Sequence, residues 1–180
     1  MKPAALVLVL ALVLPGCAGE AVGTPPAAGT PAPAFTLPDQ NGVQRSLADY
    51  AGKWLIVYFY PKDDTPGCTK QVCAFRDSID KVRAAGAEVL GVSVDDVDSH
   101  RKFAEKYQVP FPLLADADKA MARAYGVLTS KLGFQYARRD TFLIDPQGRI
   151  AKHYPDVDPE ANVGQVLEDL AALRASAPPS

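Results

Sequence analysis

The chain has 180 residues, of which 48% are apolar, and its 19 Lys and Arg residues against 21 Asp and Glu residues give a formal charge of −2. This length is enough for one domain with a hydrophobic core. The balanced charge, without a basic run, gives no indication of nucleic acid or an anionic surface as a partner.

The first sixteen residues are typical of an export signal. Lys2 supplies a positive start, and residues 4–14 form an apolar stretch of eleven residues. That stretch is shorter than the roughly 20 residues that a helix needs to span a bilayer. We therefore expect a signal peptide at residues 1–16 and an exported bacterial protein, located in the periplasm or cell envelope.

The end of this segment, Leu14-Pro15-Gly16-Cys17, resembles the cleavage box of bacterial lipoproteins. In that box the cysteine takes a diacylglycerol thioether and becomes the new N-terminus. Pro15 departs from the small or branched residue usual at its position. The resemblance implies lipidation of Cys17 and a membrane anchor, and the alternative is an ordinary signal peptide cleaved a few residues later.

The segment after Cys17 is nearly all Ala, Gly, Pro and Thr up to residue 33. Such a composition cannot bury a core and predicts a flexible linker over residues 17–33. Residues 175–180 have a similar composition and predict a flexible tail. The folded domain is then expected at residues 34–174.

Strand patterns occur four times along this domain. The first, Trp54–Tyr60, is apolar on both faces, as expected of a central strand covered on both sides. Further strands are predicted at Glu88–Val94, near Pro112–Ala115 and at Thr141–Asp145. Asp145-Pro146-Gln147-Gly148 predicts a turn that joins the last of these to a strand at Arg149–Tyr154.

Helical spacing lies between the strands. Val72, Phe75, Ile79 and Val82 form one stripe of a helix that Gly86 ends. A second helix carries His100, Phe103 and Tyr107 and stops before Pro110, and a short third covers Lys119–Tyr125. Asp158-Pro159 predicts the start of a last helix, whose inward residues are Val163, Val166, Leu167, Leu170 and Leu173.

This alternation of strands and helices, closed by an antiparallel hairpin and a final helix, predicts an α/β fold. We expect a thioredoxin-like three-layer sandwich with a central mixed β-sheet.

Cys68 and Cys73 are placed for sulfur chemistry. Cys68 lies where the first strand hands over to a helix, and the first N–H groups of a helix carry partial positive charge that favours a thiolate. On one helix the two Cα atoms lie roughly 8.6 Å apart, whereas a disulfide rarely tolerates more than about 7 Å. Cys68 shares the inward stripe and Cys73 the polar face, so a disulfide between them requires the helix to unwind.

The string Phe59 to Cys73, with Pro61-x-x-x-Thr65-x-x-Cys68 at its centre, resembles the active-site signature of peroxiredoxins, in the peroxiredoxin Q (bacterioferritin comigratory protein) subgroup. The resemblance runs from about Phe35 to Leu173. It implies a thiol-dependent peroxidase, dependent on thioredoxin or a similar dithiol, which reduces hydrogen peroxide and organic hydroperoxides without a cofactor. It also implies a monomer.

The resemblance assigns a role to each residue that matches the signature. Cys68 is the peroxidatic cysteine, which becomes a sulfenic acid, and Cys73 resolves it as an intramolecular disulfide. Thr65 hydrogen-bonds the thiolate and the incoming oxygen, and Pro61 shields the site from water. Arg139, which is adjacent to Arg138 and easily confused with it, favours the thiolate and stabilises the leaving oxygen.

Other readings of these residues remain open at this point. The main alternative is an exported thioredoxin-fold copper carrier or assembly protein, although such carriers usually have three residues between their cysteines. A disulfide oxidoreductase would have two. His100 and His153 are interpreted as structural rather than as metal ligands. The acidic pairs Asp63-Asp64 and Asp95-Asp96 follow strands and are interpreted as solvated loop residues.

Overall fold

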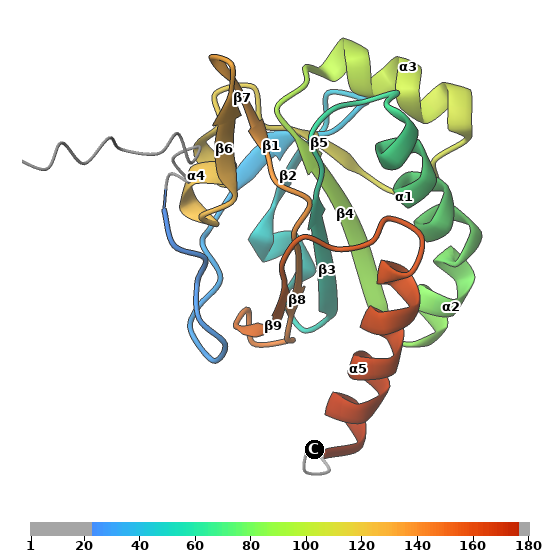
Figure 1. The fold of residues 1–180 in the computed structure, drawn as a ribbon. Helices are drawn as coiled ribbons and strands as arrows, with labels where there is room; N and C mark the ends of the chain where they lie inside the picture. The colour runs from blue at the N-terminus through green and yellow to red at the C-terminus, as the bar shows by residue number, and fades with distance from the viewer. Residues whose placement is uncertain (1–22, 177–180) are drawn as a thin grey trace, which may run out of the picture.

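The computed structural model describes residues 23–176, which form a central sheet covered by helices on both faces (Figure 1). The sheet has the strand order β5-β4-β3-β8-β9. Strands β3, β4 and β5 are parallel, and β8 and β9 are antiparallel to their neighbours. The predicted thioredoxin-like α/β fold with a mixed sheet is confirmed.

The strands of this sheet lie close to their predicted positions. Their bounds are Trp54–Phe59 for β3, Ala87–Ser93 for β4, Leu113–Ala115 for β5, Thr141–Ile144 for β8 and Ile150–Tyr154 for β9. Every side chain of β3 after Trp54 is buried, as the apolar run predicts for a central strand.

Two short hairpins, which the sequence did not predict, lie outside the central sheet. The first joins β1 (Thr36–Pro38) to β2 (Gln44–Ser46), and a 3-10 helix follows at Leu47–Tyr50. The second joins β6 (Leu128–Lys131) to β7 (Phe134–Ala137).

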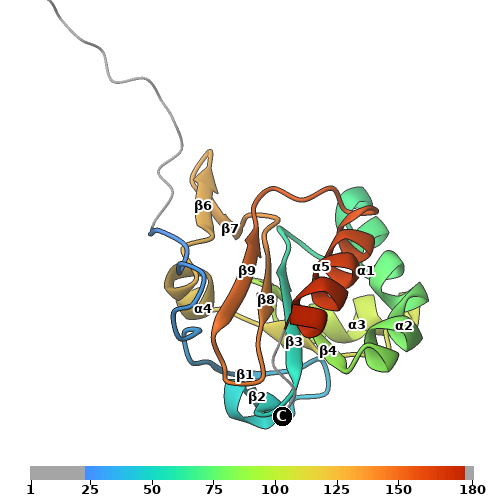
Figure 2. The same cartoon turned by 90° about the horizontal axis from the view of Figure 1, so that it is seen from below.

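The helices divide between the two faces of the sheet. On one face, a core of buried apolar residues joins β3 and β4 to α1 (Pro66–Asp77), α2 (Ile79–Ala84), α3 (Val97–Tyr107) and α5 (Asn162–Ser176). On the other face, a second core includes α4 (Ala120–Ala124) and the residues that precede β1. Figure 2 shows α5 beside α1 and α2, and α4 on the far side of the sheet.

Two helix predictions need correction. The stripe from Val72 to Val82 belongs to two helices, because the helix is interrupted at Ser78. The last helix begins at Asn162 rather than at Pro159. Asp158 instead accepts hydrogen bonds from the N–H groups of Glu160 and Ala161, in a turn that precedes α5.

The predicted linker is also partly wrong, because residues 23–33 lie against the domain. The N–H groups of Gly29 and Ala32 donate to carbonyl groups at the turn before β9 and at its start, and Ala32 is buried. Gly126 makes this docking possible, since a Cβ there would lie 2.4 Å from the carbonyl carbon of Thr24. Composition predicted flexibility, but backbone hydrogen bonds hold this segment.

The predicted signal peptide, the lipidation site Cys17 and most of the predicted tail lie outside the described residues. Within residues 23–176, no helix is long and apolar enough to cross a membrane.

Candidate active site

Cys68 lies in the first turn of α1, at the end of the loop that follows β3. Pro66 occupies the first position of this helix, where its missing N–H has no cost. The Cys68 side chain is 1% exposed and belongs to the core between α1 and the sheet. The fold thus places its sulfur in a protected site at the positive end of a helix.

The loop before α1 is fixed by Asp63, which is buried. Its carboxylate accepts hydrogen bonds from the Tyr60 hydroxyl at 2.7 Å and the Ser99 hydroxyl at 2.7 Å, and it pairs with Nδ1 of His100 at 2.8 Å. Nε2 of His100 must carry a proton, since its partner at 3.0 Å is the Leu114 carbonyl, which only accepts. The interpretation of Asp63 as a solvated loop acid is therefore wrong.

Asp64 provides a second connection between this loop and α3. Its carboxylate accepts from Nζ of Lys106 at 2.7 Å and from the Tyr107 hydroxyl at 2.8 Å. These hydrogen bonds lower the pKa of Asp64. Its backbone has a φ of 55°, in the left-handed region that Asp tolerates better than most residues. Both acids of the pair thus hold the loop against α3.

Arg139 approaches Cys68 from the loop between β7 and β8. Its Nη2 lies 3.3 Å from the Cys68 sulfur, and its Nη1 donates to Oε1 of Gln71 at 2.8 Å. Gly67 leaves room for this approach, because a Cβ there would lie 3.1 Å from Nη2. Arg138 instead donates to Asp140 and to the Gly126 carbonyl. The structure therefore brings Arg139, and not Arg138, to Cys68.

Gln71 is a site residue that the sequence reasoning missed. It is buried one helical turn after Cys68, and its carbonyl oxygen orients the Arg139 guanidinium. Its amide nitrogen is buried without a hydrogen-bond partner among the described residues. A spacing of three residues places two side chains on the same helix face, and this signal was available in the sequence.

Cys73 is only half-buried, and its side chain packs against the same core as Cys68. The helical wheel predicted an outward position, so Cys73 is less exposed than expected. Both cysteines are free and both lie on α1. With the helix intact, their Cα atoms are separated by roughly 8.6 Å, beyond disulfide reach.

Thr65 and Pro61 lie in the loop that leads into α1, and within residues 23–176 Thr65 makes no hydrogen bond to the Cys68 sulfur. Thr65 is the N-cap residue of α1, and its hydroxyl donates to the Lys62 carbonyl at 3.0 Å. The predicted hydrogen bond from Thr65 to the thiolate is therefore not formed in this state. Pro61 is half-buried and lines a cavity of about 360 Å³, shared with Val94, Asp95 and residues 134–136.

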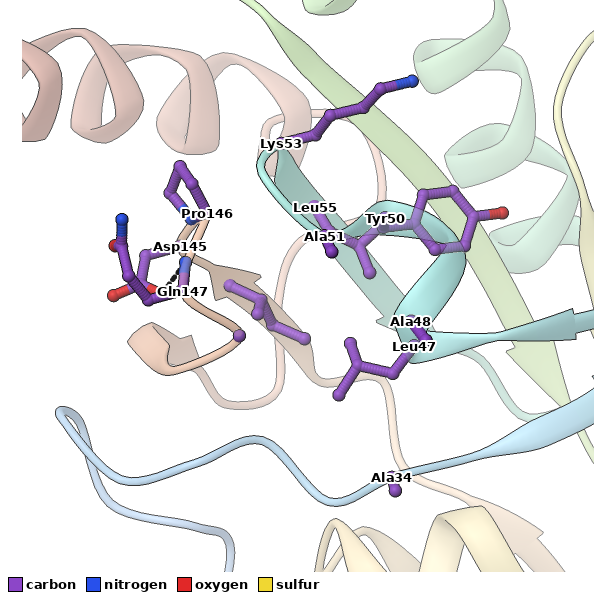
Figure 3. Close-up of a pocket in the computed structure, with 12 residues that line it drawn as sticks. Ala34, Leu47, Ala48, Tyr50, Ala51, Lys53, Leu55, Asp145, Pro146 and Gln147 are labelled. Carbon is purple, nitrogen blue, oxygen red and sulfur yellow. Dashed lines mark hydrogen bonds between the residues drawn. The ribbon is translucent and has the colours of Figure 1, made fainter.

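A separate apolar cavity lies at the opposite end of β3 (Figure 3). Leu47, Leu55 and Pro146 are among its lining residues, and none of the predicted site residues borders it. Within residues 23–176, no group of three or more His, Cys, Asp or Glu side chains is arranged to hold a metal ion.

Comparisons with known proteins agree on one family. The AhpC/TSA family matches residues 28–153. A protein of Coxiella burnetii named as the peroxiredoxin bcp is 47% identical over 146 residues, which cover 79% of this chain and 97% of the relative.

Solved structures with the same fold include two bacterial proteins. Peroxidoxin BcpB of Mycobacterium tuberculosis has a TM-score of 0.77 at 34% identity and covers 82% of this chain and 97% of its own. The bacterioferritin comigratory protein of Xanthomonas campestris, studied for alkyl peroxide reduction, has a TM-score of 0.76 at 37% identity. That match covers 82% of this chain and 99% of the Xanthomonas chain.

Proposed function

This chain belongs to the AhpC/TSA family and is a thiol-dependent peroxidase, and we propose that Cys68 is the residue that attacks the peroxide. The observation that carries this assignment is the contact of 3.3 Å between Nη2 of Arg139 and the Cys68 sulfur. A guanidinium at this distance favours the thiolate, which is the reactive form of cysteine. The copper-carrier alternative is not favoured by the comparisons.

In the proposed first step, the Cys68 thiolate attacks one oxygen of the peroxide. A sulfur–oxygen bond forms, the oxygen–oxygen bond breaks, and the leaving oxygen departs as hydroxide or alkoxide, which takes up the proton that the Cys68 thiol released to solvent when it ionised. Cysteine is oxidised to sulfenic acid while the peroxide is reduced. Arg139, oriented by Gln71, supplies hydrogen bonds to the charge that develops on the leaving oxygen.

Cys73 resolves the sulfenic acid in the second step. Its sulfur attacks the Cys68 sulfur, water leaves, and a disulfide forms. Because the helix separates the two cysteines, the first turns of α1 must unwind before this bond can form. A thioredoxin-like dithiol then reduces the disulfide by exchange and is itself oxidised.

The substrates proposed for this chain are hydrogen peroxide and organic hydroperoxides. Alkyl peroxide reduction by the Xanthomonas relative supports the second class. We further propose that the enzyme acts as a monomer in the periplasm or cell envelope, anchored through lipid on Cys17. The apolar stretch of residues 4–14 and the Leu14–Cys17 box support this location.

Serine variants of the two cysteines test the assignment. Cys68→Ser should abolish peroxidase activity, whereas Cys73→Ser should complete one turnover and stop as a sulfenic acid on Cys68. A dimedone-type reagent traps that acid, and peptide mass spectrometry locates the adduct. An adduct on Cys73 with unmodified Cys68 in the wild-type protein would reverse the two roles.

A further inference from the structure

Two strongly exposed apolar side chains lie at the tip of the β6–β7 hairpin. Leu132 is 90% exposed and Phe134 is 78% exposed. Among the described residues, Val43 is the other large apolar side chain in this exposed class, at 47%. Single exposed apolar residues are common, but two at one projecting tip form a patch that suits an apolar partner.

The backbone conformation of this tip does not favour leucine at position 132. Leu132 and Gly133 connect Lys131 directly to Phe134, with φ angles of 52° and 82°. Two successive positive φ angles are typical of a type I′ turn, which favours Asn-Gly. Leucine is disfavoured in this region and gains no burial at this position. An apolar residue that neither packs nor suits the turn points to contact outside the domain.

The described chain begins next to the base of this hairpin. A Cβ on Gly23 would lie 3.3 Å from Cα of Gly126, just before β6. Figure 2 shows the hairpin projecting from the side of the domain on which the described chain begins. An anchor N-terminal to Gly23 would therefore turn the side of the domain that carries Leu132 and Phe134 toward the membrane.

The length of chain outside the described residues sets how far this side can be from an anchor. Only five residues lie between Cys17 and Gly23, so the six steps from one Cα atom to the next span at most about 20 Å even when the chain is fully extended. The four strand residues of β6, Leu128–Lys131, carry the tip roughly 13 Å from the base of the hairpin. A lipid on Cys17 would thus keep the tip within reach of the membrane surface.

We propose that the hairpin tip, Leu132 and Phe134, inserts into the interfacial region of a phospholipid bilayer when the domain is held by its N-terminal segment. This inference rests on the proposed lipidation of Cys17. Leucine and aromatic side chains are well suited to the boundary between headgroups and acyl chains. The neighbouring Lys131 is exposed and can reach anionic headgroups.

The consequence for function is that the membrane lies beside the active-site loop. Phe134 lines the same cavity as Pro61 and Lys62, which belong to the loop before α1. A bilayer at the tip would bring oxidised acyl chains next to this cavity. The proposed substrate class that follows is phospholipid hydroperoxides within the membrane.

Fluorescence quenching by brominated lipids tests this contact. The lipidated Phe134→Trp protein, isolated from membranes, is reconstituted into phosphatidylethanolamine and phosphatidylglycerol vesicles with brominated acyl chains. Wild type, with Trp54 alone, gives the baseline, and Val43→Trp is the matched control at an exposed site outside the hairpin. We expect the added fluorescence of Trp at 134 to be quenched and that of Trp at 43 to be unaffected.

If brominated lipid quenches Trp at 134 no more than Trp at 43, in protein that floats with the vesicles, the inference is overturned while the anchor remains intact. A blue shift of the 134 emission without vesicles, rising with protein concentration, would also overturn it, because the tip would then bind a second copy. If mass spectrometry finds no lipid on Cys17, the anchoring proposal fails. The contact is then tested after coupling a maleimide lipid to Cys17 in a Cys68→Ser, Cys73→Ser background, where absence of quenching overturns it and quenching supports it.

A substitution that suits the turn provides a second measurement. Leu132→Asn creates the Asn-Gly pair that a type I′ turn prefers, so the hairpin should remain folded, and thermal melting checks this. We expect the rate with phospholipid hydroperoxide in vesicles, divided by the rate with hydrogen peroxide, to fall about tenfold, equivalent to about 1.4 kcal/mol. An unchanged ratio in the folded variant would contradict the proposal.

Discussion

Replacing Arg139 should slow the attack of Cys68 on peroxide through two separable effects. One hydrogen bond from a charged donor to the Cys68 sulfur is lost, and such bonds contribute about 1.5–3 kcal/mol. A sulfur that loses this bond is also more nucleophilic, which returns roughly half of that loss. The remaining loss of about 0.8–1.5 kcal/mol predicts a rate about four to twelve times slower in Arg139→Ala at neutral pH.

The second effect is the loss of a donor to the leaving oxygen, which slows the reaction further. Both effects act on the same step, so the total deficit should exceed the part that comes from the hydrogen bond to sulfur. The assay is rapid-quench mass spectrometry of the Cys68 sulfenic acid in a Cys73→Ser background, as a function of peroxide concentration.

Arg138→Ala is the matched control, because Arg138 contacts Asp140 and the Gly126 carbonyl rather than Cys68. Its partly exposed ion pair should have only a small influence, with a rate change below about twofold. Arg139→Lys should lie between wild type and Arg139→Ala, since lysine keeps the charge but cannot contact Gln71 and Cys68 with one planar fork. An equal deficit in both alanine variants, or an unchanged rate in Arg139→Ala, would refute the role of Arg139.

Three further predictions follow from the site and its surroundings. Gly67→Ala should lower the attack rate without lowering the melting temperature, because a Cβ 3.1 Å from Nη2 displaces Arg139 whereas alanine favours a helix; a lower melting temperature with an unchanged rate would contradict this. Burial raises the pKa of Asp116 to about 6 against hydrogen bonds from two α4 N–H groups, so the folded state binds the proton more tightly than the unfolded chain, and stability is lost as pH rises. Between about pH 4 and 6, the free energy of unfolding of wild type should fall by on the order of 2 kcal/mol relative to that of Asp116→Asn, after allowance for solvent screening. Denaturant titrations measure it, and a difference between the two proteins that does not change with pH would disprove the prediction. The Cys68–Cys73 disulfide form should show faster amide exchange in the first turns of α1, and unchanged protection there would mean that the bond forms without unwinding.

The elements that the sequence predicted well are those whose pattern reflects burial alone. Strand β3 is apolar at every position and is buried at every position after Trp54. The stripe that begins at Val72 is buried as expected, yet it could not reveal the break at Ser78, because Ile79 and Val82 continue the same stripe on α2. Periodicity reports which face is inward, and it does not report whether the backbone is continuous.

The features that the sequence did not predict depend on partners distant along the chain. Asp63 looks like a loop acid until α3 brings His100 to it, 37 residues away. Arg138 and Arg139 are equivalent in any local pattern, and only the resemblance favoured Arg139; the structure places Arg139 at Cys68, while its catalytic role stays a prediction. Residues 23–33 have the composition of a linker, but they pack against the domain because Gly126 has no Cβ that would clash with Thr24.

The interruption of the helix at Ser78 and the loop residues Asp63 and Asp64 together limit which part of α1 can unwind when the Cys68–Cys73 disulfide forms. Asp63 and Asp64 hold the chain before α1 against α3, and α2 is anchored separately by buried Ile79 and Val82. Within α1, Phe75 is fully buried and its ring stacks on Tyr58 with centroids 4.7 Å apart, so it resists unwinding. Unwinding is therefore confined to the part of α1 before Phe75, which carries both cysteines, and it must release the buried side chains of Gln71 and Val72. The same fold thus fixes the Cys68 sulfur beside Arg139 for attack and leaves the turns between the cysteines as the part that can open.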